Sequence, residues 1–239
     1  MRLSSDAWVV VSLLVVTWLM TRKIDRQPLH SVGLAFAGLP RDFFGGLANG
    51  AVWLALPLAV AWALGWIAPV DHGRFARDAL PLAALAMFVN VVARQLLLCG
   101  YLYSTFRSHV GLIAAVLLSG IFFSAYHAAG FRGEWLPALT VFLAGSLFCL
   151  AREHSGSLWL PIGIHAAWNF LLGPALGLTV SGNGQRGDGW RMIELKGPAW
   201  VTGGSFGIEG GVIVTVATAV LAAVLAIALR AQRAATARG

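Results

Sequence analysis

Long apolar stretches, separated by short polar segments, run along the whole chain. A helix that crosses a bilayer needs about 20 mostly apolar residues. The stretches that match or approach this description lie at residues 7–20, 43–70, 79–103, 110–129, 135–151, 158–180 and 211–229. The pattern therefore predicts an all-α, polytopic transmembrane bundle with about seven spans.

The first apolar stretch ends at the polar run Thr21-Arg22-Lys23, and no small-residue cleavage site follows it. We therefore expect an anchored first helix and not a removed signal peptide. No polar segment between the stretches is long enough to form a separate domain. Residues 1–239 are thus predicted to be a single membrane domain.

The composition supports a protein embedded in lipid. Of 239 residues, 58% are hydrophobic and only 11% are charged, and the mean hydropathy is +0.76. A soluble domain has about a quarter of its residues charged, so a water-soluble protein is excluded. The net charge of +7 suits contact with anionic lipid headgroups and requires no nucleic-acid partner. We expect membrane lipid around the protein and the inner membrane of a bacterial cell as its location.

Polar side chains inside the apolar stretches mark the candidate site, because burying them without partners is costly. His165 and Asn169 are four residues apart and so share one helix face. An interhelical hydrogen-bonding pair would explain them as well as a catalytic site would. His127 lies near the end of another stretch. Two histidines facing one cavity could instead titrate near neutral pH, donate to an oxyanion or bind a metal.

Three segments resemble, in order, the motifs of the CPBP family, which includes CAAX prenyl-protein endopeptidases and bacteriocin-processing or immunity proteins. Motif two, Phe-x-x-x-His, matches Phe123 to His127, and motif three, His-x-x-x-Asn, matches His165 to Asn169. The place of motif one, Glu-Glu-x-x-x-Arg-Gly-Tyr-Leu, reads Arg94-Gln95-Leu96-Leu97-Leu98-Cys99-Gly100-Tyr101-Leu102. The family core is expected over residues 79–180, and residues 203–210 resemble a tail segment found in some members.

The resemblance implies an endopeptidase buried in the membrane. In an ordinary member, the first motif-one glutamate, helped by the motif-two histidine, activates a water that attacks the scissile carbonyl. The motif-three histidine and asparagine then stabilise the oxyanion. Some schemes for the family use a metal instead, and either scheme needs the carboxylate. The resemblance therefore gives His127, His165 and Asn169 as the candidate catalytic residues.

Motif one departs from the family at the decisive position. Arg94 stands in the place of the water-activating glutamate, and a guanidinium cannot accept a proton. Gln95 can form hydrogen bonds but is no useful base, and Cys99 replaces the motif arginine. Since the two glutamates and the arginine of motif one are all replaced, we predict a CPBP-family homologue with reduced or lost proteolytic activity. Such a protein would bind a transmembrane or lipidated protein or peptide without cutting it.

Two alternatives remain open. An atypical active endopeptidase could use Cys99 as a nucleophile activated by His127 or His165, although cysteine in an apolar helix usually behaves as a small buried hydrophobe. A small transporter-like protein would show paired broken helices or repeated halves, which the sequence lacks.

No cofactor and no metal are predicted. Two histidines without a carboxylate fall short of the three protein ligands that are typical of catalytic zinc. Cys99 and Cys149 both fall in apolar stretches, so no disulfide framework is implied. The Gly-rich segment at residues 181–189 follows no predicted strand and lacks the lysine of a phosphate-binding loop. It is therefore interpreted as a connecting loop.

Overall fold

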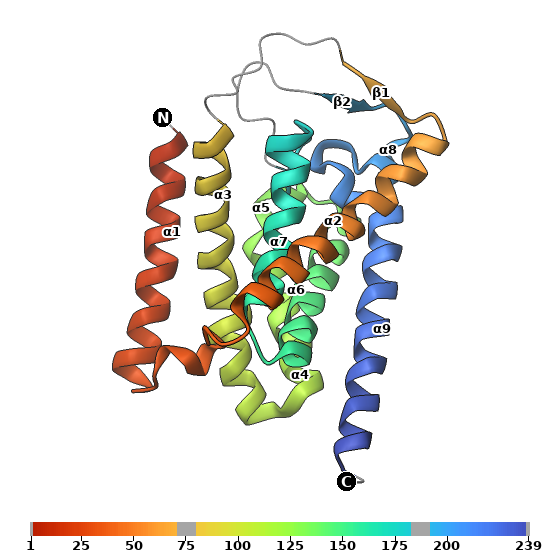
Figure 1. The fold of residues 1–239 in the computed structure, drawn as a ribbon. Helices are drawn as coiled ribbons and strands as arrows, with labels where there is room; N and C mark the ends of the chain where they lie inside the picture. The colour runs from red at the N-terminus through yellow and green to blue at the C-terminus, as the bar shows by residue number, and fades with distance from the viewer. Residues whose placement is uncertain (1, 71–79, 183–191, 238–239) are drawn as a thin grey trace.

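The computed structural model describes residues 2–70, 80–182 and 192–237, and most of them are helical (Figure 1). Most of the segment interpreted as a connecting loop, residues 183–189, lies outside the described residues. The helices are α1 (Arg2–Leu19), α2 (Leu39–Ala63), α3 (Leu80–Gln95), α4 (Tyr103–Tyr126), α5 (Ala128–Phe131), α6 (Trp135–Ser155), α7 (Trp159–Phe170), α8 (Ala199–Thr202) and α9 (Val212–Thr236). Further helical turns are η1 (Met20–Ile24), η2 (Leu29–Val32), η4 (Leu96–Leu102), η5 (Leu171–Ala175), η6 (Gly204–Phe206) and η7 (Ile208–Gly210). The predicted all-α class is confirmed.

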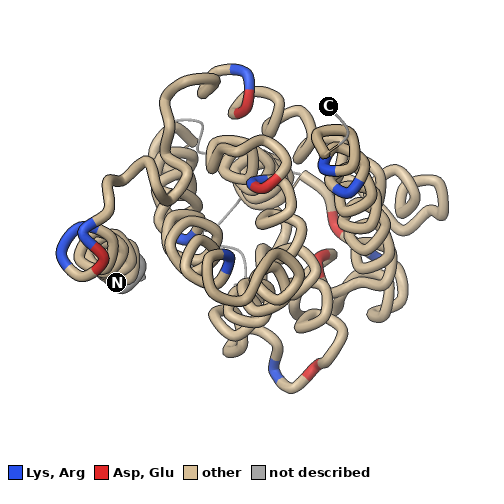
Figure 2. Tube along the Cα trace, turned by 90° about the horizontal axis from the view of Figure 1, so that it is seen from below, with Lys and Arg blue, Asp and Glu red and all other residues tan. Residues whose placement is uncertain are grey.

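A small antiparallel sheet lies beside one end of the bundle. Its strands are β1 (Ile67–Pro69) and β2 (Ile193–Leu195), with Ala68 opposite Glu194. The sheet joins the segment after α2 to the segment before α8 (Figure 1). Charged residues are sparse along the Cα trace, and most of the helical trace carries none (Figure 2).

Five helical segments of the described chain are long and apolar enough to cross a membrane. They are Ala7–Ile24, Leu39–Ala63, Leu80–Tyr126, Trp135–Ser155 and Val212–Thr236. The third is broken at Gly111, where φ is 79° and ψ is 179°, and the chain turns back at the lower end of the bundle (Figure 1).

The exact count of seven spans is not confirmed. The predicted stretch at residues 158–180 holds only the 12 residues of α7 before the hydrogen-bonding pattern changes in η5, which contains Pro174. The single-domain prediction is not tested by this arrangement and stays a prediction.

Helix α7 carries motif three and lies inside the bundle, where residues 161–169 are all buried. It packs closely against α2 through glycines on both helices. A Cβ atom on Gly46 would lie 2.4 Å from the Leu160 carbonyl oxygen, and one on Gly163 would lie 2.3 Å from that of Phe43. Small residues let helix backbones approach in this way. The close contact fixes the position of the motif-three side chains.

The motif-one segment is held by an arginine from α6. The motif-one segment ends in the π-helical turn η4, a local widening of the helix that is frequent at functional sites. Arg152 Nη1 donates to the carbonyl oxygens of Cys99 and Gly100, and Nη2 donates to Ser104 Oγ at 2.7 Å. Buried carbonyl groups need such partners. Arg152 therefore joins α6 to the segment that displays Arg94.

Candidate functional site

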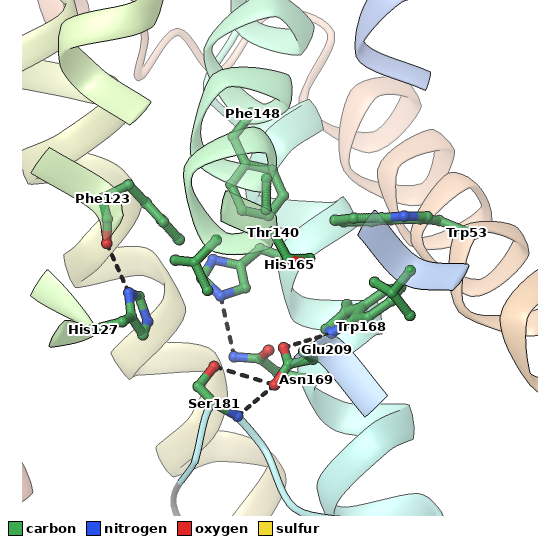
Figure 3. A pocket seen from close by; sticks show the side chains of 13 residues that line it. Trp53, Phe123, His127, Thr140, Phe148, His165, Trp168, Asn169, Ser181 and Glu209 are labelled. Carbon is green, nitrogen blue, oxygen red and sulfur yellow. Dashed lines mark hydrogen bonds between the residues drawn. The ribbon is translucent and has the colours of Figure 1, made fainter. Parts of the chain in front are cut away.

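The predicted residues His127, His165 and Asn169 meet at one small cavity inside the bundle (Figure 3). Its internal volume is about 30 Å³, which leaves room for water but not for a peptide. The wall is formed by Trp53, Phe123, His127, Thr140, Val141, Ala144, Phe148, His165, Trp168, Asn169, Ser181, Glu209 and Val214. The sequence motifs thus come together in space, although they lie on different helices.

His165 is held between aromatic rings and amides. Its ring stacks on Phe148 with 4.9 Å between centroids. Its Nε2 lies 3.2 Å from the Asn169 amide nitrogen, one helical turn away, and its Nδ1 lies 3.1 Å from the Gln95 amide nitrogen. Gln95, from the degenerate motif one, is fully buried. Motifs one and three therefore remain in direct contact.

The hydrogen bonds assign the proton of His165. A neutral imidazole has one N–H, so it cannot accept from both amides at once. Gln95 Oε1 has no partner among the described residues. Rotating this amide by half a turn lets Oε1 accept from Nδ1–H, while Asn169 donates to Nε2. In this arrangement both ring nitrogens of a neutral His165 are paired.

His127 is paired with Arg94, which stands at the first motif-one position. Its Nδ1 lies 2.8 Å from the Phe123 carbonyl oxygen, to which only Nδ1–H can donate. Its Nε2 therefore accepts, and Arg94 Nη1 lies 3.4 Å from it. The Arg94 guanidinium also lies over the Tyr126 ring, 5.0 Å from the centroid. The lone pair of the motif-two histidine is thus covered by a cation.

Comparison with known proteins agrees with the motifs. Residues 76–171 match the family model described as type II CAAX prenyl endopeptidase Rce1-like. This match supports the CPBP/CAAX protease family that the motifs resemble. The matched range contains all three motif segments. No curated protein and no solved structure matches the chain. The family match and the five long apolar helices together indicate an integral, multi-pass membrane protein. The family match also supports a CAAX-protease-like endopeptidase homologue.

The cavity also contains a carboxylate that the motifs did not reveal. Glu209 Oε1 accepts from Trp168 Nε1 at 2.8 Å, and Oε2 accepts from the backbone N–H and the hydroxyl of Ser181. Burial raises the pKa of the Glu209 carboxyl. Glu209 lies outside the matched range, and its only sequence signal was the resemblance of residues 203–210 to a tail segment of some members.

Cys99 does not line the cavity. Its Sγ accepts a hydrogen bond from Cys149 Sγ at 3.3 Å, and both thiols are free and buried. Cys99 is absent from the cavity wall, which holds both histidines. The proposed Cys–His dyad therefore gains no support from the geometry. Among the described residues, no three His, Cys, Asp or Glu side chains are grouped to hold a metal ion.

Proposed function

We propose that this CPBP-family protein binds a transmembrane or lipidated protein or peptide in the inner membrane of a bacterial cell and does not cleave it. The contact between Arg94 and His127 carries the proposal. In an ordinary member the residue in place of Arg94 would be a glutamate that removes a proton from water. Arg94 instead donates to the histidine that should assist it, so neither group is available as a base.

The remaining site favours binding without turnover. His165 and Asn169 keep their family spacing and their hydrogen bond. Gln95 replaces a charged residue by a neutral one and still contacts His165. The Asn169 amide keeps one N–H beyond its bond to His165 that could polarise a carbonyl, whereas the group that would activate water is lost.

Terminal-peptide profiling of membranes incubated with the purified protein tests the proposal. We expect no new peptide termini with the wild type. We expect new termini with the Arg94→Glu/Gln95→Glu variant, because it returns the two carboxylates to motif one. The Arg94→Glu/Gln95→Glu/Cys99→Arg variant is tested beside it, since an arginine at the buried position 99 would lie against Cys149 and Arg152.

A second candidate is an atypical endopeptidase that uses Glu209. This carboxylate lines the same cavity as His127 and His165, so water there could reach all three. In that case the wild type would produce new termini, and both Glu209→Gln and His127→Ala would abolish them. This outcome would contradict the proposal of a binding protein without cleavage.

A further inference from the structure

The two cysteines of the chain lie together, away from the cavity. Cys99 belongs to η4 and Cys149 to α6, and their sulfur atoms are 3.3 Å apart. Both residues are buried, with exposed fractions of 1% and 0%. Neither is part of the cavity wall. The chain has no other cysteine, so these thiols form a separate sulfur pair between the motif-one segment and α6.

A buried positive charge lies beside this sulfur pair. Arg152 is 8% exposed and is near enough to interact electrostatically with both cysteines. Among the described residues, its guanidinium donates to uncharged oxygens and forms no ion pair. These oxygens are the carbonyls of Cys99, Gly100 and Ser31 and the hydroxyl of Ser104. A buried charge is costly unless an opposite charge offsets it.

The adjacent carboxylate, that of Glu153, does not supply the missing negative charge. It pairs with Arg107 and Arg233 and accepts from the Tyr103 hydroxyl. Two arginines therefore already share this one negative charge. Arg152 keeps its own charge unmatched next to two thiols, and a disulfide between them would be neutral and would leave it unmatched.

We propose that Cys99 and Cys149 bind Cu(I) between their sulfur atoms. Thiolates suit Cu(I), zinc and iron–sulfur clusters, but structural zinc and the clusters take four protein ligands. No third His, Cys, Asp or Glu is grouped with the pair in the part of the chain that the structure describes. Cu(I) replaces both thiol protons, which pass to water, and no electron is transferred. The dithiolate complex then carries one negative charge, which Arg152 matches.

The geometry asks for only a small movement. With metal–sulfur distances of about 2.3 Å, two sulfurs that flank one ion lie up to about 4.6 Å apart, so the pair must open by about 1.3 Å. A polar path reaches the pair, because Arg152 Nη2 donates to Ser104 Oγ and the Ser31 carbonyl oxygen, and both serines are partly exposed. The inference is independent of the proposed function, since neither thiol lines the cavity.

Competition for Cu(I) under anaerobic conditions tests the inference. The purified protein in detergent is titrated into Cu(I) held by the coloured chelator bicinchoninate, and X-ray absorption identifies the ligands. We expect the wild type to take up about one Cu(I) per chain, with sulfur as its only neighbour. Cys99→Ala and Cys149→Ala should each remove this uptake, since one thiolate does not hold the ion against the chelator.

A comparison of two metal ions tests the role of Arg152. Hg(II) with two thiolates is neutral, so its binding reports on the fold and on access to the thiols. Arg152→Gln should weaken Cu(I) binding about tenfold to 100-fold, as is typical for groups that support a metal site from outside its ligands, and should leave Hg(II) binding unchanged. Arg152→Lys keeps the charge and should retain most of the affinity. Arg230→Gln, which removes an exposed arginine of α9, is the matched control.

No uptake of Cu(I) by the wild type would overturn the inference. Uptake that persists in either alanine variant would do the same, because the ion would then lie elsewhere. Loss of both free thiols without retained copper would show a disulfide in place of a metal site. Equal loss of Cu(I) and Hg(II) binding in Arg152→Gln would contradict the charge argument, because the arginine would then act through the fold.

Discussion

At the scale of single residues, Glu209 joins two segments of the cavity wall, since its oxygens accept from Trp168 and from Ser181. Burial raises the pKa of its carboxyl, whereas an unfolded chain has a glutamate pKa of about 4.3. Between these two values the folded protein holds the proton and the unfolded chain does not. The contribution of Glu209 to stability therefore falls as the pH rises through this interval.

The variant Glu209→Gln should remove that pH dependence. We expect the stability of the wild type relative to Glu209→Gln to decrease as the pH rises from about 4.3 toward the raised pKa. The decrease should be at most about 1.4 kcal/mol per pH unit. Thermal unfolding in detergent at a series of pH values measures it. Glu134→Gln, which changes an exposed carboxylate, is the control. A wild type that gains relative stability with rising pH would contradict the prediction.

At the scale of helices, the contact between α2 and α7 depends on the face that each glycine occupies. Gly45 and Gly46 are neighbours on α2, but a Cβ atom on Gly45 would meet nothing within 4 Å, whereas one on Gly46 would meet the α7 backbone at 2.4 Å. Backbone atoms cannot move aside as the end of a side chain can. The two glycines therefore offer a matched pair for measuring this interface.

Gly46→Ala should destabilise the protein by about 1–3 kcal/mol, because the added methyl group forces α2 away from α7. Gly45→Ala should be neutral or stabilising by up to about 1 kcal/mol, since alanine is the better helix former. Unfolding in a detergent titration gives both values. Similar losses in the two variants would show that helix approach at Gly46 is not the cause.

At the scale of the whole molecule, Glu153 on α6 connects α4 with the C-terminal helix. It accepts from the Tyr103 hydroxyl and pairs with Arg107 of α4 and Arg233 of α9. Arg107 and Arg233 are partly exposed, so each ion pair is worth less than a buried one. Together they nevertheless hold three segments that are far apart in sequence.

Glu153→Gln should lower the stability by about 1–3 kcal/mol, because a neutral amide replaces the shared acceptor of three donors. Lys196→Gln breaks the ion pair with Glu194 at 2.8 Å on the small sheet and should cost at most about 1 kcal/mol, since Lys196 is well exposed. Thermal unfolding of both variants checks the comparison. Equal losses would mean that the Glu153 cluster does not connect the helices energetically.

The order of residues alone was enough to predict the helical class, the membrane environment and the motif residues. Apolar length and helical periodicity are local properties, so they appear directly in the order of residues. The same periodicity placed His165 and Asn169 on one face, and the structure shows the hydrogen bond between them. The loss of the motif-one glutamates was also visible, because it needs only residue identity.

The packing of the helices, in contrast, sets which polar groups become partners. Arg94 and His127 are 33 positions apart, and Gln95 and His165 are 70 apart, so their contacts depend on which helices pack together. Glu209 enters the cavity from a segment beyond the family match. The number of spans depended on the break at Gly111 and on the end of α7 at Phe170. Helix formation depends on neighbouring residues in the sequence, whereas the pairing of buried polar groups depends on the packing of helices that are far apart in the sequence.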